Sequence, residues 1–329
     1  MSPTIADLFC GIGGIAEAVH LWQQSIAGDN TAPTEQRQRI IPKIGTAIDI
    51  DQSVAQLYQR HHGIIPRCST IESLQAVSLQ PAESLGAAES LGAAEKLDMW
   101  WMSPPCQPYT RRGLQRGDKD SRSLALANLI RLIPTERPRW IGLENVPAFE
   151  GSQHHQRLQQ TLNKTGYQFR EYLICPTDMG IPMRRRRFYL LATQNNKPLA
   201  DFSCRLRQQS LAEFVDADGW NDPTLQVPSD LLQQYRTAMN ILDIQDSAAI
   251  SSCFTSAYGK SPIKSGSYLH CPSRHAVRRF SPNEIANLMG FRENFFASSD
   301  LGQRSQYRLI GNSLAVHVVS ELLSMLLTE

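Results

Sequence analysis

The stretch Ile5–Trp22 constrains the fold most, because it reads as a strand, a glycine turn and a helix in direct succession. Ile5–Cys10 is apolar enough for an inner strand, Gly11–Gly14 supplies the turn, and apolar residues at helical spacing follow. Glycines let a backbone approach a ligand closely and expose the N–H groups at a helix start. The G-x-G-x-x-G spacing of dinucleotide-binding proteins is missing, so this turn alone does not identify a ligand.

Three later apolar segments predict further inner strands, each followed by a reactive or polar side chain. Ile44–Asp49 ends in a carboxylate that can accept hydrogen bonds from ribose hydroxyls; a helix-capping aspartate is the alternative. Leu97–Met102 runs into Pro104-Pro105-Cys106, and Trp140–Leu143 runs into Glu144-Asn145. Open α/β sheets bind ligands at the carboxyl ends of their strands, so these side chains are expected near one site.

Two of these positions suggest chemistry. The prolines around Cys106 donate no ladder hydrogen bond and force an extended path, which predicts a thiol presented at a strand end. The alternative is a half-buried structural cysteine in a proline-rich turn. Burial of Glu144 would raise its proton affinity, which suits a group that hands a proton to a ring nitrogen. Its alternative role is to cap a helix before Pro147.

Length and composition restrict the class of protein. A chain of 329 residues exceeds what a single core of roughly 250–300 residues holds, so two lobes are expected. The 41% hydrophobic and 19% charged residues are typical of a soluble globular protein, and no apolar run reaches the roughly 20 residues of a membrane span. Met1–Phe9 does not resemble a signal peptide. The seven cysteines include no C-x-x-C pair, which predicts reduced thiols, a cytoplasmic location and no metal site.

The positive charge is clustered although the net charge is only +2. Basic residues follow the cysteine segment, and a second block precedes the predicted strand Phe188–Ala192: Arg111, Arg112, Arg116, Lys119 and Arg122, then Arg184, Arg185, Arg186 and Arg187. Such runs are commonly solvated faces, but their positions favour contact with nucleic acid. The duplicated stretch 82–94 is interpreted as a surface insertion without chemistry.

Five segments together resemble the ordered motifs of the DNA cytosine-5 methyltransferase family, over almost the whole chain. They are Phe9–Gly14, Pro104–Gln107, Glu144–Val146, Arg185-x-Arg187 and Gly311–Leu314. The resemblance implies an α/β fold: a Rossmann-like class I methyltransferase domain that binds S-adenosyl-L-methionine and releases S-adenosyl-L-homocysteine. It also implies boundaries: a catalytic domain at 1–194, a small target-recognition domain at 195–305, and a C-terminal helix at 306–329 that returns to the first domain.

The same resemblance assigns roles. Cys106 would add to carbon 6 of a cytosine, Glu144 would protonate ring nitrogen 3, and Asn145 would hold the Glu144 loop. Arg187 and Arg185 would contact the target base or its phosphate. The implied cofactor contacts are Phe9, Cys10, Gly11, Ile12, Gly13, Gly14, Asp49, Ile50, Thr70, Ile71, Pro104, Asn312 and Ser313. Thr70 departs from the family, because many relatives have an aspartate there for the adenine amine.

The small lobe resembles the tRNA-methylating branch of this family. Its Cys253-Phe254-Thr255 matches the Cys-Phe-Thr signature of that branch, although packing inside the lobe is an alternative role for it. The branch implies a cytosine in a tRNA anticodon loop as substrate and a monomeric enzyme. Expected substrate contacts are Arg111, Arg112, Arg122, Cys253, Phe254, Thr255 and Tyr258. Two alternatives stay open: a DNA cytosine-5 methyltransferase of a modification system, and a nucleic-acid-binding protein without catalysis.

Overall fold

The computed structural model describes residues 2–28, 41–74, 97–106, 109, 123–196, 198–204, 207–274, 276–297 and 299–327. The chain divides into two compact units. The sheet unit comprises Met1–Ile174, Arg186–Phe202 and Val319–Glu329, and the insert unit comprises Cys175–Arg185 and Ser203–Val318.

These divisions differ from the boundaries expected from the sequence, 1–194, 195–305 and 306–329. Cys175–Arg185 belongs to the insert unit because its backbone is bonded there: Arg184 N–H donates to the Ser251 carbonyl at 2.8 Å, and Ser251 N–H donates to the Pro182 carbonyl at 2.9 Å. The chain returns to the sheet unit at Val319, later than expected, since Val316 N–H still donates to Met289 at 2.8 Å.

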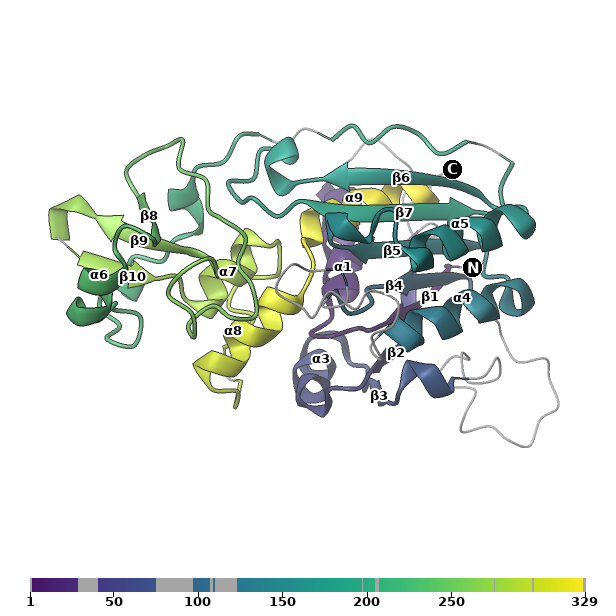
Figure 1. Ribbon diagram of the computed structural model, residues 1–329, viewed down its shortest axis with the longest axis horizontal. Coiled ribbons are helices and arrows are strands. Elements are labelled where there is room, and N and C mark those ends of the chain that lie inside the picture. Colours follow the sequence, from purple (N-terminus) through teal and green to yellow (C-terminus); the bar gives the residue numbers. More distant parts are fainter. Residues whose placement is uncertain are drawn as a thin grey trace. The chain divides into compact units, whose positions relative to one another are not determined.

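The sheet unit is built on one seven-stranded sheet of order β3-β2-β1-β4-β5-β7-β6 (Figure 1). The strands are β1 (Thr4–Leu8), β2 (Lys43–Asp49), β3 (Arg67–Cys68), β4 (Met99–Met102), β5 (Trp140–Asn145), β6 (Gln168–Ile174) and β7 (Arg187–Thr193). The first five strands of the order are parallel, whereas β7 is antiparallel to both of its neighbours. This confirms the Rossmann-like α/β sheet expected from the sequence.

Helices cover this sheet as α1 (Gly14–Gly28), α3 (Ala55–His62), α4 (Leu124–Glu136) and α5 (Gln153–Lys164). Apolar side chains of α4 and α5 join one face of β1, β4 and β5 in a single core. The two helices lie in front of the sheet in Figure 1. On β1, Ala6 and Leu8 belong to that core, whereas Asp7 points to the other face and bonds Tyr58 of α3. The period of two along β1 therefore separates an apolar face from a polar contact under the glycine turn.

The inner strands are packed too closely for arbitrary side chains. All four residues of β4 are buried, as expected for a parallel strand with both faces covered. A Cβ atom on Gly142 of β5 would lie 2.3 Å from Cε3 of Trp101 on β4. The glycine in Trp140–Leu143 is therefore required by the indole ring on the neighbouring strand.

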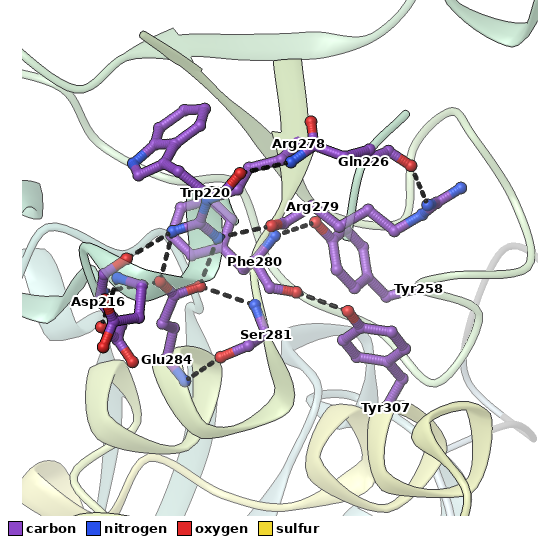
Figure 2. Close-up of polar contacts among 11 residues, drawn as sticks. Asp216, Trp220, Gln226, Tyr258, Arg278, Arg279, Phe280, Ser281, Glu284 and Tyr307 are labelled. Atoms are coloured by element: carbon purple, nitrogen blue, oxygen red, sulfur yellow. Dashed lines mark hydrogen bonds and ion pairs between the residues drawn. The ribbon is translucent and has the colours of Figure 1, made fainter. Parts of the chain in front are cut away.

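The insert unit contains a three-stranded sheet of order β10-β9-β8 and several short helices. Its elements include α6 (Ser229–Tyr235), β8 (Asn240–Asp243), β9 (Ser267–Cys271), β10 (Ala276–Arg279), α7 (Pro282–Leu288) and α8 (Gln303–Asn312). Figure 2 shows a polar cluster in this unit, in which Arg278 of β10 and Glu284 of α7 form a fully buried ion pair. Tyr258 and Tyr307 bind the backbone of Phe280 beside that pair.

The segment Gln303–Leu327 is long and apolar enough to cross a membrane by length and composition, although no apolar run of that length was expected from the sequence. It consists of α8 and α9 (Val316–Leu327), separated where Ser313 takes an extended conformation. Of its apolar window, 67% is buried inside the protein, as in a core helix.

Candidate active site

Cys106 follows the carboxyl end of β4, in a segment that is fixed by several bonds. Ser103 N–H donates to the Leu8 carbonyl at 3.2 Å, which continues the pairing of β1 with β4. The indole N–H of Trp101 donates to the Ser103 hydroxyl at 3.1 Å. The Cys106 thiol is partly exposed, and the Cys106 carbonyl accepts from Tyr109 N–H at 2.9 Å. Cys106 thus lies four residues beyond the end of β4 and is partly exposed, and its role as a nucleophile stays a prediction.

Asn145 ends β5 and joins that strand to the cysteine segment. Its side-chain amide donates to the Pro104 carbonyl at 3.2 Å, and its side-chain oxygen accepts from Val146 N–H at 2.8 Å. The side chain is almost completely buried, so both bonds are made in a low-dielectric environment, where they are stronger than in water. Asn145 therefore holds the backbone after Glu144, as expected, and also the backbone two residues before Cys106.

Glu144 and Arg187 face each other across β5 and β7, with Nε of Arg187 at 3.2 Å from Oε1 of Glu144. The antiparallel register pairs Asn145 with Phe188, so the first residue of β7 lies at the carboxyl edge of β5. Both side chains are mostly buried. This contact orients the carboxylate at the same sheet edge as Cys106. A contact between Arg187 and the target base stays a prediction.

The arginine block alternates, but one of its members has a different role from the predicted one. Arg184 and Arg186 are exposed, whereas Arg185 is buried. The Arg185 guanidinium donates to the carbonyls of Phe254 at 2.9 Å and Gly311 at 3.2 Å, and also to that of Ser313. All three acceptors belong to the insert unit. Arg185 is therefore a structural tie of that unit, and its expected contact with the target base is wrong.

The Cys253-Phe254-Thr255 segment is likewise part of the insert-unit core. Phe254 and Tyr258 are each 1% exposed, so neither can contact a substrate. Tyr258 donates to the Ser267 carbonyl at 2.6 Å. A Cβ atom on Gly311 would lie 2.3 Å from the Thr255 backbone, which explains the glycine there. The packing alternative is correct for Phe254, and the expected substrate contact of Tyr258 is wrong because its side chain is buried. Substrate contact by the partly exposed Cys253 and Thr255 stays a prediction.

Several residues predicted to contact the cofactor or the substrate are not linked to the site by the contacts described above. Asn312 is exposed and Ser313 is partly buried at the end of α8, where the Ser313 carbonyl binds Arg185. Their contact with a cofactor stays a prediction. Arg111, Arg112 and Arg122 lie outside the described residues.

The glycine turn after β1 has an unusual backbone. Phe9, Gly11 and Gly13 have φ values of +64°, +51° and +89°, in the left-handed region that favours glycine. Cys10 N–H donates to the Ile48 carbonyl at 3.0 Å, which ties the turn to β2, and Ile12 and Gly14 are buried. A Cβ atom on Gly11 would meet nothing within 4 Å, whereas one on Gly13 would lie 2.4 Å from Nε2 of His62. The Gly11 backbone thus faces open space, whereas the His62 side chain packs against Gly13.

Asp49, the last residue of β2, is hydrogen-bonded to this turn. Its two carboxylate oxygens accept from Gly11 N–H and Asp51 N–H, each at 2.8 Å. Burial raises the pKa of Asp49, although these backbone bonds lower it. A carboxylate has about four acceptor positions, so ribose hydroxyls can still be accepted. Next to it, Ile50 exposes 67% of its surface. An apolar side chain beside a carboxylate and an open glycine backbone fits a nucleoside.

Thr70 and Ile71 differ in what they offer a cofactor. Thr70 is exposed, and its hydroxyl is hydrogen-bonded to the Ser73 hydroxyl at 2.8 Å. Ile71 is buried, and its carbonyl accepts from the Asn128 side chain at 2.8 Å. A contact between Thr70 and the adenine of a cofactor stays a prediction.

A polar layer under the glycine turn was missed from the sequence. The Tyr58 hydroxyl donates to the Asp7 carboxylate at 3.1 Å, and Nε2 of His62 lies 3.7 Å from the Glu17 carboxylate. Tyr58 and His62 pack edge to face with their ring centroids 4.8 Å apart. These contacts could not be predicted from the sequence, because they join residues that lie far apart in the chain, on β1, α1 and α3.

Asp7 predicts a pH-dependent stability. Burial raises its pKa to about 7, against the lowering effect of the Tyr58 bond, and the nearby Asp49 charge adds to the rise. In the unfolded chain the pKa is near 3.8. Between these values the folded protein binds one more proton at this site, so the free energy of unfolding falls as the pH rises.

We expect Asp7→Asn to remove this dependence, because asparagine keeps the acceptor for Tyr58 and cannot ionise. Its stability relative to the wild type should increase from about pH 4 to about pH 7 by at most about 1.4 kcal/mol per pH unit, and then level off. Urea unfolding of both proteins across this range measures it. Parallel curves would show that Asp7 titrates normally.

The fold and the site together define an enzyme of the Rossmann-like methyltransferase class. The glycine turn follows β1, a carboxylate ends β2, a thiol follows β4, and a second carboxylate lies at the carboxyl end of β5. Residues 3–327 match the family described as C-5 cytosine-specific DNA methylase, and the chain belongs to this family. This confirms the family predicted from the sequence.

Individual relatives show which members of this family the chain is similar to. A human protein named tRNA (cytosine(38)-C(5))-methyltransferase is 25% identical, and the match covers 98% of both chains. A Dictyostelium discoideum protein named DNA (cytosine-5)-methyltransferase is 30% identical over 71% of this chain and 78% of its own. The crystal structure of a Schizosaccharomyces pombe Dnmt2 methyltransferase is similar with a TM-score of 0.79 and 26% identity, over 100% of this chain and 99% of that chain.

Proposed function

We propose that this enzyme transfers a methyl group from S-adenosylmethionine to carbon 5 of a cytosine in the anticodon loop of a tRNA. The observation that carries the chemistry is the Asn145 side chain, which links the strand of Glu144 to the segment of Cys106. The choice of tRNA is supported by the human relative, whose match includes the insert unit as well as the sheet unit.

Cytosine carbon 5 is a poor nucleophile, so the reaction must first make it electron-rich. The Cys106 thiolate forms a bond to carbon 6 while Glu144 provides a proton to ring nitrogen 3, and the displaced electron pair makes carbon 5 nucleophilic. Arg187 holds the Glu144 carboxylate in position through the 3.2 Å contact. After methyl transfer, a base removes the proton from carbon 5, the thiolate is expelled, and ring nitrogen 3 returns its proton to Glu144, which restores the free enzyme.

The residues around the glycine turn fit the cofactor. Asp49 would accept hydrogen bonds from ribose, Ile50 would cover the adenine ring, and the open backbone at Gly11 would lie against the ligand. When bound, S-adenosylmethionine supplies the electrophilic methyl group. Pro104, which is also expected at the cofactor, lies two residues before Cys106, and its carbonyl is bound by Asn145.

A cytosine inside a duplex cannot reach a thiol at a sheet edge. It must leave its stack, which costs a few kcal/mol and is cheapest in a single-stranded loop. An anticodon loop meets this requirement without melting a helix, which supports RNA as the substrate. DNA methylation is the second candidate, favoured by the 30% identity to the Dictyostelium protein.

Labelled methyl transfer separates the two candidates. The enzyme is incubated with S-adenosylmethionine and, in parallel, with unmodified tRNA or with genomic DNA that lacks methylated cytosine. We expect label in tRNA, mapped to one anticodon-loop cytosine by bisulfite sequencing. Label in DNA alone would transfer the function to DNA modification, and label in neither would contradict both.

A further inference from the structure

We propose that His154 is a positioning residue for the Cys106 thiol, acting through the hydroxyl of Tyr109. The inference rests on the proposed function for its catalytic consequence. Its structural part concerns the sheet unit alone, in which all of these residues lie.

Tyr109 is held from two directions. Its hydroxyl is hydrogen-bonded to Nδ1 of His154 on α5 at 3.2 Å. Its ring packs edge to face on Phe149, with centroids 5.2 Å apart and an interplanar angle of 86°. His154 is 2% exposed, and a buried imidazole is normally hydrogen-bonded. The pair therefore satisfies a buried polar ring while it fixes the tyrosine side chain.

The position of Tyr109 is transmitted to the nucleophile by the backbone. Tyr109 N–H donates to the carbonyl of Cys106 at 2.9 Å, which closes a turn that begins at the reactive residue. On the other side of the thiol, the Asn145 amide binds the Pro104 carbonyl at 3.2 Å. Cys106 is thus held before and after by side chains of one segment, 145–154, which directly follows Glu144.

The base of α5 is itself well fixed, so it can serve as the support. The Ser152 hydroxyl caps α5 by accepting from His155 N–H at 3.1 Å. Nδ1 of His155 accepts from Gly151 N–H at 3.0 Å, so its Nε2 carries the proton that reaches Glu171 at 2.7 Å. His155 and Phe188 pack on Phe149 from the side, and Phe149 in turn supports the Tyr109 ring. The mechanism requires the thiol and the Glu144 carboxyl to act on one base, and this segment connects the two.

The test uses variants that separate the hydrogen bond from packing. Tyr109→Phe keeps the ring on Phe149 and removes the hydroxyl. His154→Leu removes the ring nitrogen, and His154→Asn restores an acceptor near the position of Nδ1. Gln160→Leu changes an exposed residue of the same helix and is the matched control. The double variant Tyr109→Phe/His154→Leu completes a double-mutant cycle.

The first readout needs no substrate. Iodoacetamide labels the thiols, and mass spectrometry compares the rate at Cys106 with the rate at the exposed Cys68 of the same molecule. Loss of one hydrogen bond should change the Cys106 to Cys68 ratio about fivefold. The second readout is methyl transfer, in which kcat should fall roughly tenfold with both KM values unchanged, because misplacement of a nucleophile affects the chemical step.

We expect Tyr109→Phe, His154→Leu and the double variant to share one effect, and His154→Asn and Gln160→Leu to resemble the wild type. Additive effects, a change in KM alone, or an unchanged alkylation ratio would overturn the proposal. If the wild type methylates neither tRNA nor DNA, the proposed function fails while the alkylation ratio still decides whether His154 positions Cys106.

Discussion

Replacement of Cys106 by alanine is expected to abolish methyl transfer and to leave the binding of S-adenosylmethionine within about twofold of the wild type. Without the thiol, no bond forms at carbon 6 and carbon 5 is never made nucleophilic. The loss should be on the order of 10⁴-fold or more, as for other covalent nucleophiles. Gly11, Asp49 and Ile50, the residues proposed to bind the nucleoside part of the cofactor, lie at or just after the ends of β1 and β2 and not on the cysteine segment.

The experiment combines labelled methyl transfer with calorimetric titration of the cofactor. Cys204→Ala is the matched control, since Cys204 is a thiol of comparable partial exposure in the insert unit. It should retain activity. Residual activity of Cys106→Ala near the wild-type level would exclude Cys106 as the nucleophile, and loss of cofactor affinity together with activity would make it a structural residue.

Local patterns were sufficient for the parts of the site that lie at strand ends. The apolar run Leu97–Met102 and the prolines after it required a strand that stops just before Cys106, and the structure has β4 ending at Met102. The same holds for the turn at Gly11–Gly14, where glycines permit the backbone angles that the turn needs. Such features depend on residues close together in the sequence, so they could be predicted.

The direction of a side chain in an irregular segment could not be predicted in this way. Arg185 and Arg187 look equivalent in the sequence, yet Arg187 begins β7 and contacts Glu144. Arg185 instead donates to backbone carbonyls of the insert unit, those of Phe254, Gly311 and Ser313. Its acceptors lie 69 to 128 residues away. The partner of each guanidinium therefore required tertiary structure.

A family signature also does not say whether its residues are exposed. Cys253-Phe254-Thr255 pointed to the right branch of relatives, but Phe254 and Tyr258 fill the centre of the insert unit. The two distant motifs are in contact, because the Thr255 backbone occupies the space that a side chain at Gly311 would need. The bond between Tyr109 and His154 was missed for a similar reason, since 45 residues separate them.

The second large effect is expected in the insert unit, where Glu284→Gln should reduce the free energy of unfolding by about 3–5 kcal/mol. Arg278 donates to both carboxylate oxygens of Glu284, at 2.8 and 2.6 Å, and both side chains are almost completely buried (Figure 2). The Trp220 ring lies 4.7 Å from the guanidinium carbon. Loss of the carboxylate charge leaves the Arg278 cation in a low-dielectric environment with neutral acceptors alone, which is why the cost is large.

Hydrogen exchange at the amides of β9 and β10 measures this effect where it arises. Exchange should accelerate by roughly 150- to 5,000-fold, which corresponds to the expected loss of stability of about 3–5 kcal/mol. Arg207→Met is the matched control, because Arg207 and Glu213 form an exposed ion pair in the same unit and such pairs contribute little. Equal exchange in the wild type and in Glu284→Gln would mean that the buried pair does not stabilise the unit.

A double variant, Arg278→Met/Glu284→Gln, then separates the charge from the second role of Glu284. The Glu284 carboxylate also accepts from Ser281 N–H at 2.7 Å, which caps α7, and from Asp216 N–H at 2.8 Å, which holds the loop at Asp216. Removal of the cation abolishes the unpaired charge, and the glutamine has one oxygen to accept from two backbone donors. We therefore expect a stability between those of the wild type and Glu284→Gln. Full recovery would show that capping contributes nothing, and a further loss would show that Arg278 stabilises the unit mainly through its bond to the Asp216 carbonyl and its contact with Trp220.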